Sequence, residues 1–161
     1  MNGGWLALVA AGTLAAATAV RGGSRAVSVA VHRDDDGDVF AFLTKNGEMI
    51  EDAYLEIRLP SADELRILLV EEGVDTVTAV QPDGPQPVGF LTGMELPDRY
   101  QRQGWGKAML GAAMRKATQI GAREFYVLSL RSAVGFYEKL GFKSVANTAI
   151  GPLMRIGLED E

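Results

Sequence analysis

Two glycines and three cationic side chains form the part of the sequence with the clearest chemical use. Gly104 and Gly106 lie where a loop becomes the first turn of a helix, and Arg99, Arg102 and Lys107 surround them in the sequence. The first turn of a helix leaves backbone N–H groups without partners, and the helix dipole adds partial positive charge there. Glycine has no Cβ, so an anionic oxygen can approach these amides closely. The pattern predicts a site for an anion such as a diphosphate.

This loop lies between a predicted strand and a predicted helix. Pro87–Leu96 is a strand-like run, and Lys107–Gly121 carries apolar residues at helical spacing. The helix is expected to end at Gly121, because glycine readily adopts the conformation of a helix C-cap. Phe125–Leu130 is an apolar run typical of a buried parallel strand. The order of these elements predicts a strand–helix–strand unit that holds the anion site after its first strand.

The elements after this unit are a second helix over Ala133–Leu140, which Gly141 ends, and a closing pair of strands over Lys143–Ile150 and Leu153–Leu158. Before the unit, three strands are predicted, over Val27–His32, Val39–Lys45 and Glu48–Leu59. Asn46-Gly47 is a strong signal for a tight hairpin between the last two of these. The acidic run Asp34–Asp38 lacks the rest of a calcium-binding loop, so we expect a solvated turn and no metal.

Two segments lie between these strands and the loop, and the sequence leaves the structure of the first one open. Ser61-Ala62-Asp63-Glu64 is typical of a helix start, which favours a short helix over Leu65–Glu72. The alternation of apolar residues there also permits a strand, and periodicity does not decide between the two. Val74–Val80 is predicted as a strand that pairs with Pro87–Leu96 as an antiparallel hairpin.

The composition limits the classes of protein to which the chain can belong. It has 161 residues, of which 47% are hydrophobic, and this suits one globular domain with a substantial core. It contains no cysteine, which excludes disulfides, zinc–thiolate sites and cysteine nucleophiles. The formal net charge of −5 argues against binding to nucleic acid through phosphate contacts. A locally basic loop on an acidic chain fits a small anionic ligand better than a polyanion.

The N-terminal segment Trp5–Val20 is almost entirely apolar. It is short for a membrane span and lacks the positive start of a signal peptide. Alanines at every fourth position predict a helix with a small-residue face, which permits close helix packing. We therefore divide the chain into an apolar helix with a glycine joint, residues 1–24, and a main domain, residues 25–161. We expect this helix to do one of three things: to pack on its own domain, to contact other subunits or to contact a membrane.

Two segments together resemble the signatures of the GNAT superfamily of acyl-CoA N-acyltransferases. Gln101–Gly106, QRQGWG, fits the pattern Q/R-x-x-G-x-G/A, and Ala133–Phe142, AVGFYEKLGF, is similar to the second signature. Their order and separation also match, and the resemblance covers about residues 87–158. It implies an α/β fold with a mixed central sheet flanked by helices, here extended by the apolar N-terminal helix.

The resemblance implies a role for particular residues. The amides from Arg102 to Lys107 would hold the pyrophosphate of acetyl-CoA, and the backbone of Leu96 would pair with the pantetheine arm. Tyr137 matches the residue that protonates the departing thiolate in many members, and its alternative is an aromatic side chain packed on the sheet. The residues assigned to the cofactor are Leu96, Gln101, Arg102, Gln103, Gly104, Trp105, Gly106 and Lys107.

The sequence departs from the family pattern where a catalytic base is expected. The strand face that ends at Leu96 carries Phe90, Thr92 and Met94, with no carboxylate. Glu95 is the nearest candidate, but in a regular strand it points to the other face, as a solvent-facing residue would. Ser129–Ser132 also replaces the asparagine that often precedes the second helix.

These observations support an N-acetyltransferase that moves an acetyl group from acetyl-CoA to a primary amine by direct attack. We expect it in the cytoplasm, without metal and without nucleic acid as a partner. The alternative is a GNAT-like structural protein without activity, such as an internal or tail-associated bacteriophage virion component assembled through its N-terminal helix. A sensor that binds acyl-CoA without transferring the acyl group is a third interpretation.

Overall fold

The structure is a computed structural model that describes residues 15–19, 27–74 and 86–158. The chain forms two compact units. The first contains Met1–Glu56 and Gly93–Lys116, and the second contains Ile57–Thr92 and Ala117–Glu161. Each unit is described by itself below.

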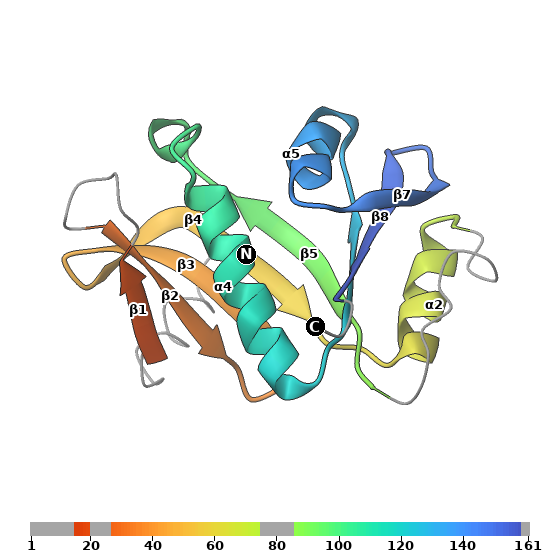
Figure 1. Cartoon of the computed structure of the whole chain (residues 1–161), viewed down its shortest axis with the longest axis horizontal. Coiled ribbons are helices and arrows are strands. Elements are labelled where there is room, and N and C mark those ends of the chain that lie inside the picture. The colour runs from red at the N-terminus through yellow and green to blue at the C-terminus, as the bar shows by residue number, and fades with distance from the viewer. Residues whose placement is uncertain (1–14, 20–26, 75–85, 159–161) are drawn as a thin grey trace. The chain divides into compact units, whose positions relative to one another are not determined.

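The strands of the first unit follow one another in the order β1-β2-β3-β4 (Figure 1). They are β1 (Ala15–Ala19), β2 (Val27–Arg33), β3 (Val39–Lys45) and β4 (Glu48–Arg58). Strands β2 and β3 pair antiparallel in an unbroken register from Val27↔Lys45 to Arg33↔Val39. Asn46 and Gly47 connect β3 to β4 with φ angles of 53° and 83°, the positive values that a tight type I′ hairpin turn requires. The predicted strands and hairpin of this region are therefore confirmed.

The helix expected over Trp5–Val20 is wrong for its described part. Ala15–Ala19 form strand β1, which pairs antiparallel with β2. Pairing with β2 satisfies the backbone N–H and C=O groups of these residues through the sheet, and this tertiary gain exceeds the helical preference of alanine. The remainder of the predicted helix lies outside the described residues.

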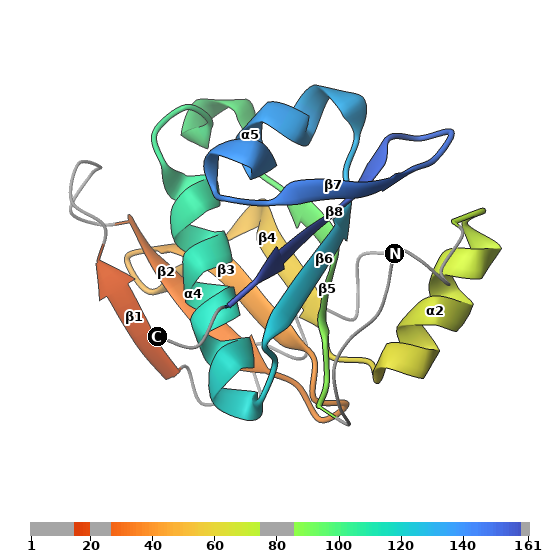
Figure 2. The ribbon, with the colours of Figure 1, turned by 45° about the vertical axis from the view of Figure 1, so that its right-hand side comes forward.

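Helix α4 (Trp105–Ile120) crosses the face of strands β2–β4 in both views of the ribbon (Figures 1 and 2), and its residues up to Lys116 belong to the first unit. The side chains on its inner face are almost fully buried, as helical spacing predicts. They are Trp105, Met109, Leu110, Ala112 and Ala113. The helix ends before Gly121, whose φ of 124° only glycine adopts without strain.

The strands of the second unit lie in the order β5-β6-β8-β7 (Figure 2). Strand β5 (Gly89–Glu95), whose last residues extend into the first unit, pairs parallel with β6 (Glu124–Leu128). Strand β8 (Pro152–Gly157) pairs antiparallel with both β6 and β7 (Lys143–Asn147). The strand–helix–strand unit and the closing pair of strands are thus confirmed. The predicted partner of β5 at Val74–Val80 lies, except for Val74, outside the described residues.

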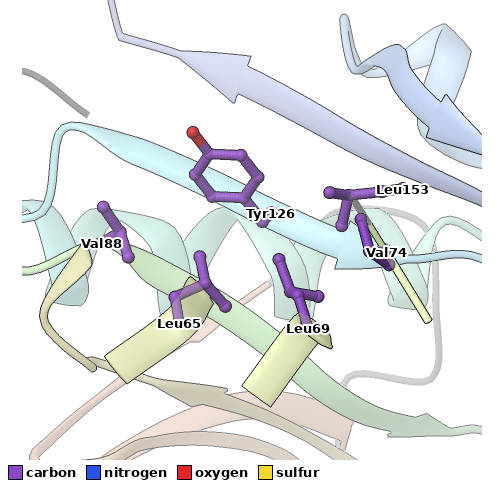
Figure 3. Close-up of a cluster of buried hydrophobic side chains, with 6 residues drawn as sticks. All are labelled: Leu65, Leu69, Val74, Val88, Tyr126 and Leu153. Atoms are coloured by element: carbon purple, nitrogen blue, oxygen red, sulfur yellow. The ribbon is translucent and has the colours of Figure 1, made fainter. Parts of the chain in front are cut away.

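The ambiguous segment after β4 is the helix α2 (Ala62–Glu71). Ser61 caps it by accepting a hydrogen bond from the Glu64 amide, and the Glu64 carboxylate accepts one from the Ser61 amide in return. The buried face of the helix packs into a cluster with residues of β6, β8 and the chain before β5 (Figure 3). The cluster consists of Leu65, Leu69, Val74, Val88, Tyr126 and Leu153.

The second signature forms a short 3-10 turn, Arg131–Ala133, followed by helix α5 (Val134–Lys139). Gly141 ends the helix with a φ of 98° and leads the chain into Phe142 and β7. Within the described ranges, no helix has the length and apolar character needed to cross a membrane.

Candidate active site

The chain leaves strand β5 through a loop that is held by its own side chains. After Leu96 and Pro97 comes a 3-10 turn, Asp98–Tyr100. The side-chain amide of Gln101 then donates to the Leu96 carbonyl at 2.9 Å and to the Asp98 carboxylate at 3.2 Å. Gln101 therefore closes the loop back onto the end of β5. The Leu96 carbonyl, which the sequence assigned to the pantetheine arm, already accepts one hydrogen bond.

The next residues prepare the start of helix α4. Arg102 and Gly104 have φ angles of 60° and 86°, so the backbone turns sharply on each side of Gln103. The first hydrogen bond of the helix runs from the Ala108 amide to the Gly104 carbonyl at 3.0 Å. The amides of Trp105, Gly106 and Lys107 precede this bond and have no helical carbonyl to reach. A Cβ built on Gly104 would meet no atom within 4 Å, so the space beside it is open.

Burial differs sharply between the loop and the residue after it. Gln101, Arg102, Gln103 and Gly104 are exposed, whereas Trp105 is only 2% exposed. Trp105 therefore fixes the first turn of the helix in the core of its unit, while the four residues before it are exposed. Among the predicted binding residues, Gly106 is half-buried and Lys107 is exposed. The guanidinium of Arg99 lies over the Tyr100 ring, 5.0 Å from its centre, and adds positive charge to the loop.

Glu95 has a neighbour that the sequence did not indicate. It is exposed at the end of β5, as expected for a residue on the face opposite Leu96. Burial and the nearby charges of Glu95, Glu56 and Asp52 raise the pKa of the Tyr54 hydroxyl. A Cβ on Gly93 would lie 3.9 Å from the Tyr54 ring, an ordinary van der Waals distance, so the ring of this β4 residue lies next to β5. No local pattern in Glu48–Leu59 could have revealed this contact, because it depends on which strands become neighbours.

Tyr137 lies in the second unit, on helix α5. It is 5% exposed and packs edge-on against Phe136 and Phe142, with ring centres 5.1 and 5.5 Å away. Burial raises the pKa of its hydroxyl to about 12, so the phenol is neutral and a hydrogen-bond donor at neutral pH. Tyr137 is therefore packed against two aromatic rings and also carries a proton at neutral pH.

Ser129 begins the segment Ser129–Ser132, which stands before α5 where the resemblance suggested an asparagine. Ser129 is buried; its amide donates to the Pro152 carbonyl at 3.0 Å and its hydroxyl to the Leu130 carbonyl at 2.8 Å. Gly151 permits this approach, because a Cβ there would lie 2.0 Å from the Ser129 carbonyl oxygen. The amide and the hydroxyl of Ser129 therefore both stabilise the chain that leads to α5.

Most of the predicted site residues, but not all of them, belong to one unit. Glu95 and the eight predicted cofactor residues belong to the first unit, and Tyr137 belongs to the second. The predicted cofactor residues offer backbone amides and cations, which are the donors that a pyrophosphate group needs. The described part of the chain contains no group of three His, Asp or Glu side chains that could hold a metal ion.

Comparison with protein families gives a match to the acetyltransferase (GNAT) family over residues 33–142. This match spans most of the chain and both signature segments, and the protein belongs to the GNAT acetyltransferase family. No curated protein matches the sequence.

Solved structures of the same fold are similar to this chain at low sequence identity. PaiA N-acetyltransferase from Thermoplasma acidophilum, in complex with coenzyme A, is 16% identical over 74% of this chain and 60% of its own, with a TM-score of 0.54. Ribosomal-protein-S18-alanine N-acetyltransferase from Escherichia coli is 20% identical over 80% and 74%, with a TM-score of 0.50. N-acetylglutamate synthase from Neisseria gonorrhoeae, complexed with coenzyme A and N-acetyl-glutamate, is 12% identical over 75% and 26%, with a TM-score of 0.51. These similarities establish the mixed α/β GNAT fold.

Proposed function

We propose that this protein is an N-acetyltransferase that transfers an acetyl group from acetyl-CoA to a primary amine. The observation that carries the proposal is the start of α4, where the amides of Trp105, Gly106 and Lys107 precede the first helical hydrogen bond and the space beside Gly104 is open. Unpaired amides at the positive end of a 16-residue helix are suited to a phosphate group. The coenzyme A bound in PaiA and in N-acetylglutamate synthase supports the same ligand for this fold.

The cations of the loop would complete this phosphate site. Arg102 and Lys107 are exposed and lie on either side of Gly104 in the sequence. Arg99 is held over Tyr100 and so has less freedom to lose when an anion binds. Gln101, through its hydrogen bonds to Leu96 and Asp98, keeps the loop in the shape that presents the amides. The binding site therefore depends on backbone shape more than on any single side chain.

Acetyl-CoA supplies the acyl group as a thioester, which a primary amine attacks directly as the C–N bond forms and the C–S bond breaks. In this proposal Tyr137 donates its proton to the departing sulfur. Burial raises its pKa to about 12, so the phenol keeps its proton at neutral pH and can donate a hydrogen bond to the sulfur as negative charge develops there. Glu95, which is exposed at the end of β5, is the candidate to accept the proton that the amine loses, directly or through water.

Calorimetric titration with acetyl-CoA tests the cofactor site. Gly104→Asp places a carboxylate where the phosphate would bind, and we expect a loss of affinity of at least about 100-fold from charge repulsion and blocked amides. Gly47→Asp is the matched control: Gly47 also has a positive φ, 83°, and a Cβ there would also meet no atom within 4 Å. The control therefore adds the same charge and the same backbone strain far from the loop in sequence.

The outcomes separate the three interpretations. Loss of binding in Gly104→Asp with normal binding in Gly47→Asp supports the cofactor site. Absence of binding to the unmodified protein would overturn the proposal and favour a structural role. Binding without turnover for any primary amine would leave an acyl-CoA sensor as the function.

A further inference from the structure

The second unit contains a pocket that the signature segments do not explain. Its volume is about 690 Å³, within the range of small-molecule sites. The walls come from the chain before β5, the amino end of β6, the start of β7 and the carboxyl end of β8. No residue of the loop from Pro97 to Lys107 lines it. That loop follows the carboxyl end of β5, whereas the pocket residues Gln86, Pro87 and Val88 precede its amino end.

The pocket carries an excess of positive charge. Its charged lining residues are Arg123, Lys143, Arg155 and Glu124. Glu124 forms an ion pair with Arg155 across the β6–β8 pair and accepts a hydrogen bond from the Tyr126 hydroxyl at 3.3 Å. Arg155 and Glu124 therefore neutralise each other, and two cations remain. This positive lining stands out on a chain whose net charge is −5.

The two remaining cations are available to a ligand. Arg123 and Lys143 are both exposed, and neither forms an ion pair with another residue in the described ranges. The Arg123 backbone is fixed, since its carbonyl accepts a hydrogen bond from the Leu158 amide at 2.8 Å. Lys143 is fixed through strand β7, where it pairs with Arg155 of β8. Both side chains thus start from ordered backbone, which lowers the entropy lost when they bind an anion.

Part of the remaining lining is apolar, and Gln86 and Ser144 are polar. Val88, Val145 and Ile156 belong to three different segments, and Val145 is one of the exposed large hydrophobic residues of the described chain. Exposed apolar surface next to unpaired cations suits a ligand with two chemically different ends. We propose that this pocket binds a small amphipathic anion, in which Arg123 and Lys143 hold a phosphate or carboxylate group and the side chains of Val145 and Ile156 contact an apolar body.

Calorimetry with phenyl phosphate, at constant ionic strength and with acetyl-CoA at saturation, tests the proposal. Acetyl-CoA occupies the proposed cofactor site, so any added binding must occur elsewhere. We expect phenyl phosphate to bind, inorganic phosphate to bind more weakly and benzyl alcohol not to bind. Equal affinity for phenyl phosphate and inorganic phosphate would overturn the apolar part of the proposal, and no binding of either would overturn the site.

Two variants test whether phenyl phosphate binds in this pocket. Lys143→Glu should weaken phenyl phosphate at least about 10-fold, because it replaces a charge-assisted contact by repulsion. Lys45→Glu is the matched control, since Lys45 is also an exposed lysine at the end of a strand and the charge change is the same. The affinity of the Lys45→Glu variant for phenyl phosphate should remain within about twofold of that of the unmodified protein. Equal weakening in both variants would mean a general charge effect and would overturn the site.

The Gly104→Asp variant separates this inference from the proposed function. Phenyl phosphate should bind this variant with unchanged affinity, whether or not acetyl-CoA still binds. Loss of phenyl phosphate binding in Gly104→Asp would assign the signal to the loop before α4 and overturn the pocket. At phenyl phosphate about 100 times above its dissociation constant, the melting temperature should rise by about 5 °C in the unmodified protein.

Discussion

The two signature segments use opposite means to prepare a site. The loop before α4 is exposed and offers backbone amides, and its side chains mainly hold its shape. The segment around α5 offers one side chain, Tyr137, which is buried between Phe136 and Phe142. A site made of amides should tolerate side-chain changes that preserve the turn. A site made of one hydroxyl should lose its function with that single atom.

The largest effect is expected at the residue that fixes the loop to the core. Trp105→Ala removes a fully buried side chain and should lower the free energy of unfolding by about 3–5 kcal/mol. Denaturant titration measures this change, with Lys107→Ala on the same helical turn as an exposed control. If Trp105→Ala lost acetyl-CoA binding without losing stability, the backbone interpretation of the loop would be wrong.

The next effect tests the single hydroxyl of the second segment. Tyr137→Phe keeps the ring and its packing, so stability and acetyl-CoA affinity should change little while kcat falls about 100-fold. Tyr126→Phe is the control, because Tyr126 is another buried tyrosine of the same unit whose hydroxyl bonds to Glu124. Steady-state kinetics on both variants gives the comparison. A similar fall in kcat for both would show that Tyr137 contributes packing alone.

A smaller effect is expected for a side chain that only shapes the loop. Gln101→Ala removes the two hydrogen bonds to Leu96 and Asp98. It should weaken the binding of acetyl-CoA by about 1 kcal/mol, or roughly 5-fold. Gln119→Ala, an exposed glutamine later in α4, should have no effect. Titration calorimetry measures both. A loss as large as that expected for Gly104→Asp would mean that the Gln101 side chain itself contacts the ligand.

The smallest effect concerns stability at alkaline pH. Burial raises the pKa of Tyr137 and of Tyr126 to about 12, above the usual value of 10. Between pH 10 and 12 the unfolded chain loses these protons and the folded chain retains them, so the free energy of unfolding falls as pH rises. Below pH 10 both states are protonated and these groups add no pH dependence. Denaturant titrations from pH 9 to 11 should show a shallower fall for Tyr137→Phe; an unchanged slope would contradict the burial of its hydroxyl.

Much of the fold followed from short-range patterns. Asn46-Gly47 predicted a hairpin because few residues tolerate two consecutive positive φ angles, and the structure has that turn. The helix over Lys107–Gly121 and the strand after it followed from spacing, although α4 begins two residues earlier, at Trp105. Leu65–Glu72 could not be assigned from periodicity, and the capping box at Ser61 is what favours the helix.

The candidate site was predictable to the extent that it depends on neighbours in the chain. The loop residues Gln101–Lys107 act through local turns, caps and unpaired amides, and all of these are encoded within a few residues. The position of Tyr54 next to Gly93 was not predictable, because it joins residues of two strands that α2 separates in the chain. The same applies to Arg123, Lys143 and Arg155, which meet only because β6, β8 and β7 lie side by side.

The sequence by itself determined the turn before α4, the two GNAT signatures and the main helices, because local backbone preferences and periodicity decide these. Only the tertiary structure decided that Ala15–Ala19 form a strand, that Tyr54 lies next to Gly93 and that three distant cations share one pocket. The physical reason is the same in each case. Strand pairing satisfies backbone groups between segments far apart in the chain, and no local pattern specifies which segments will meet.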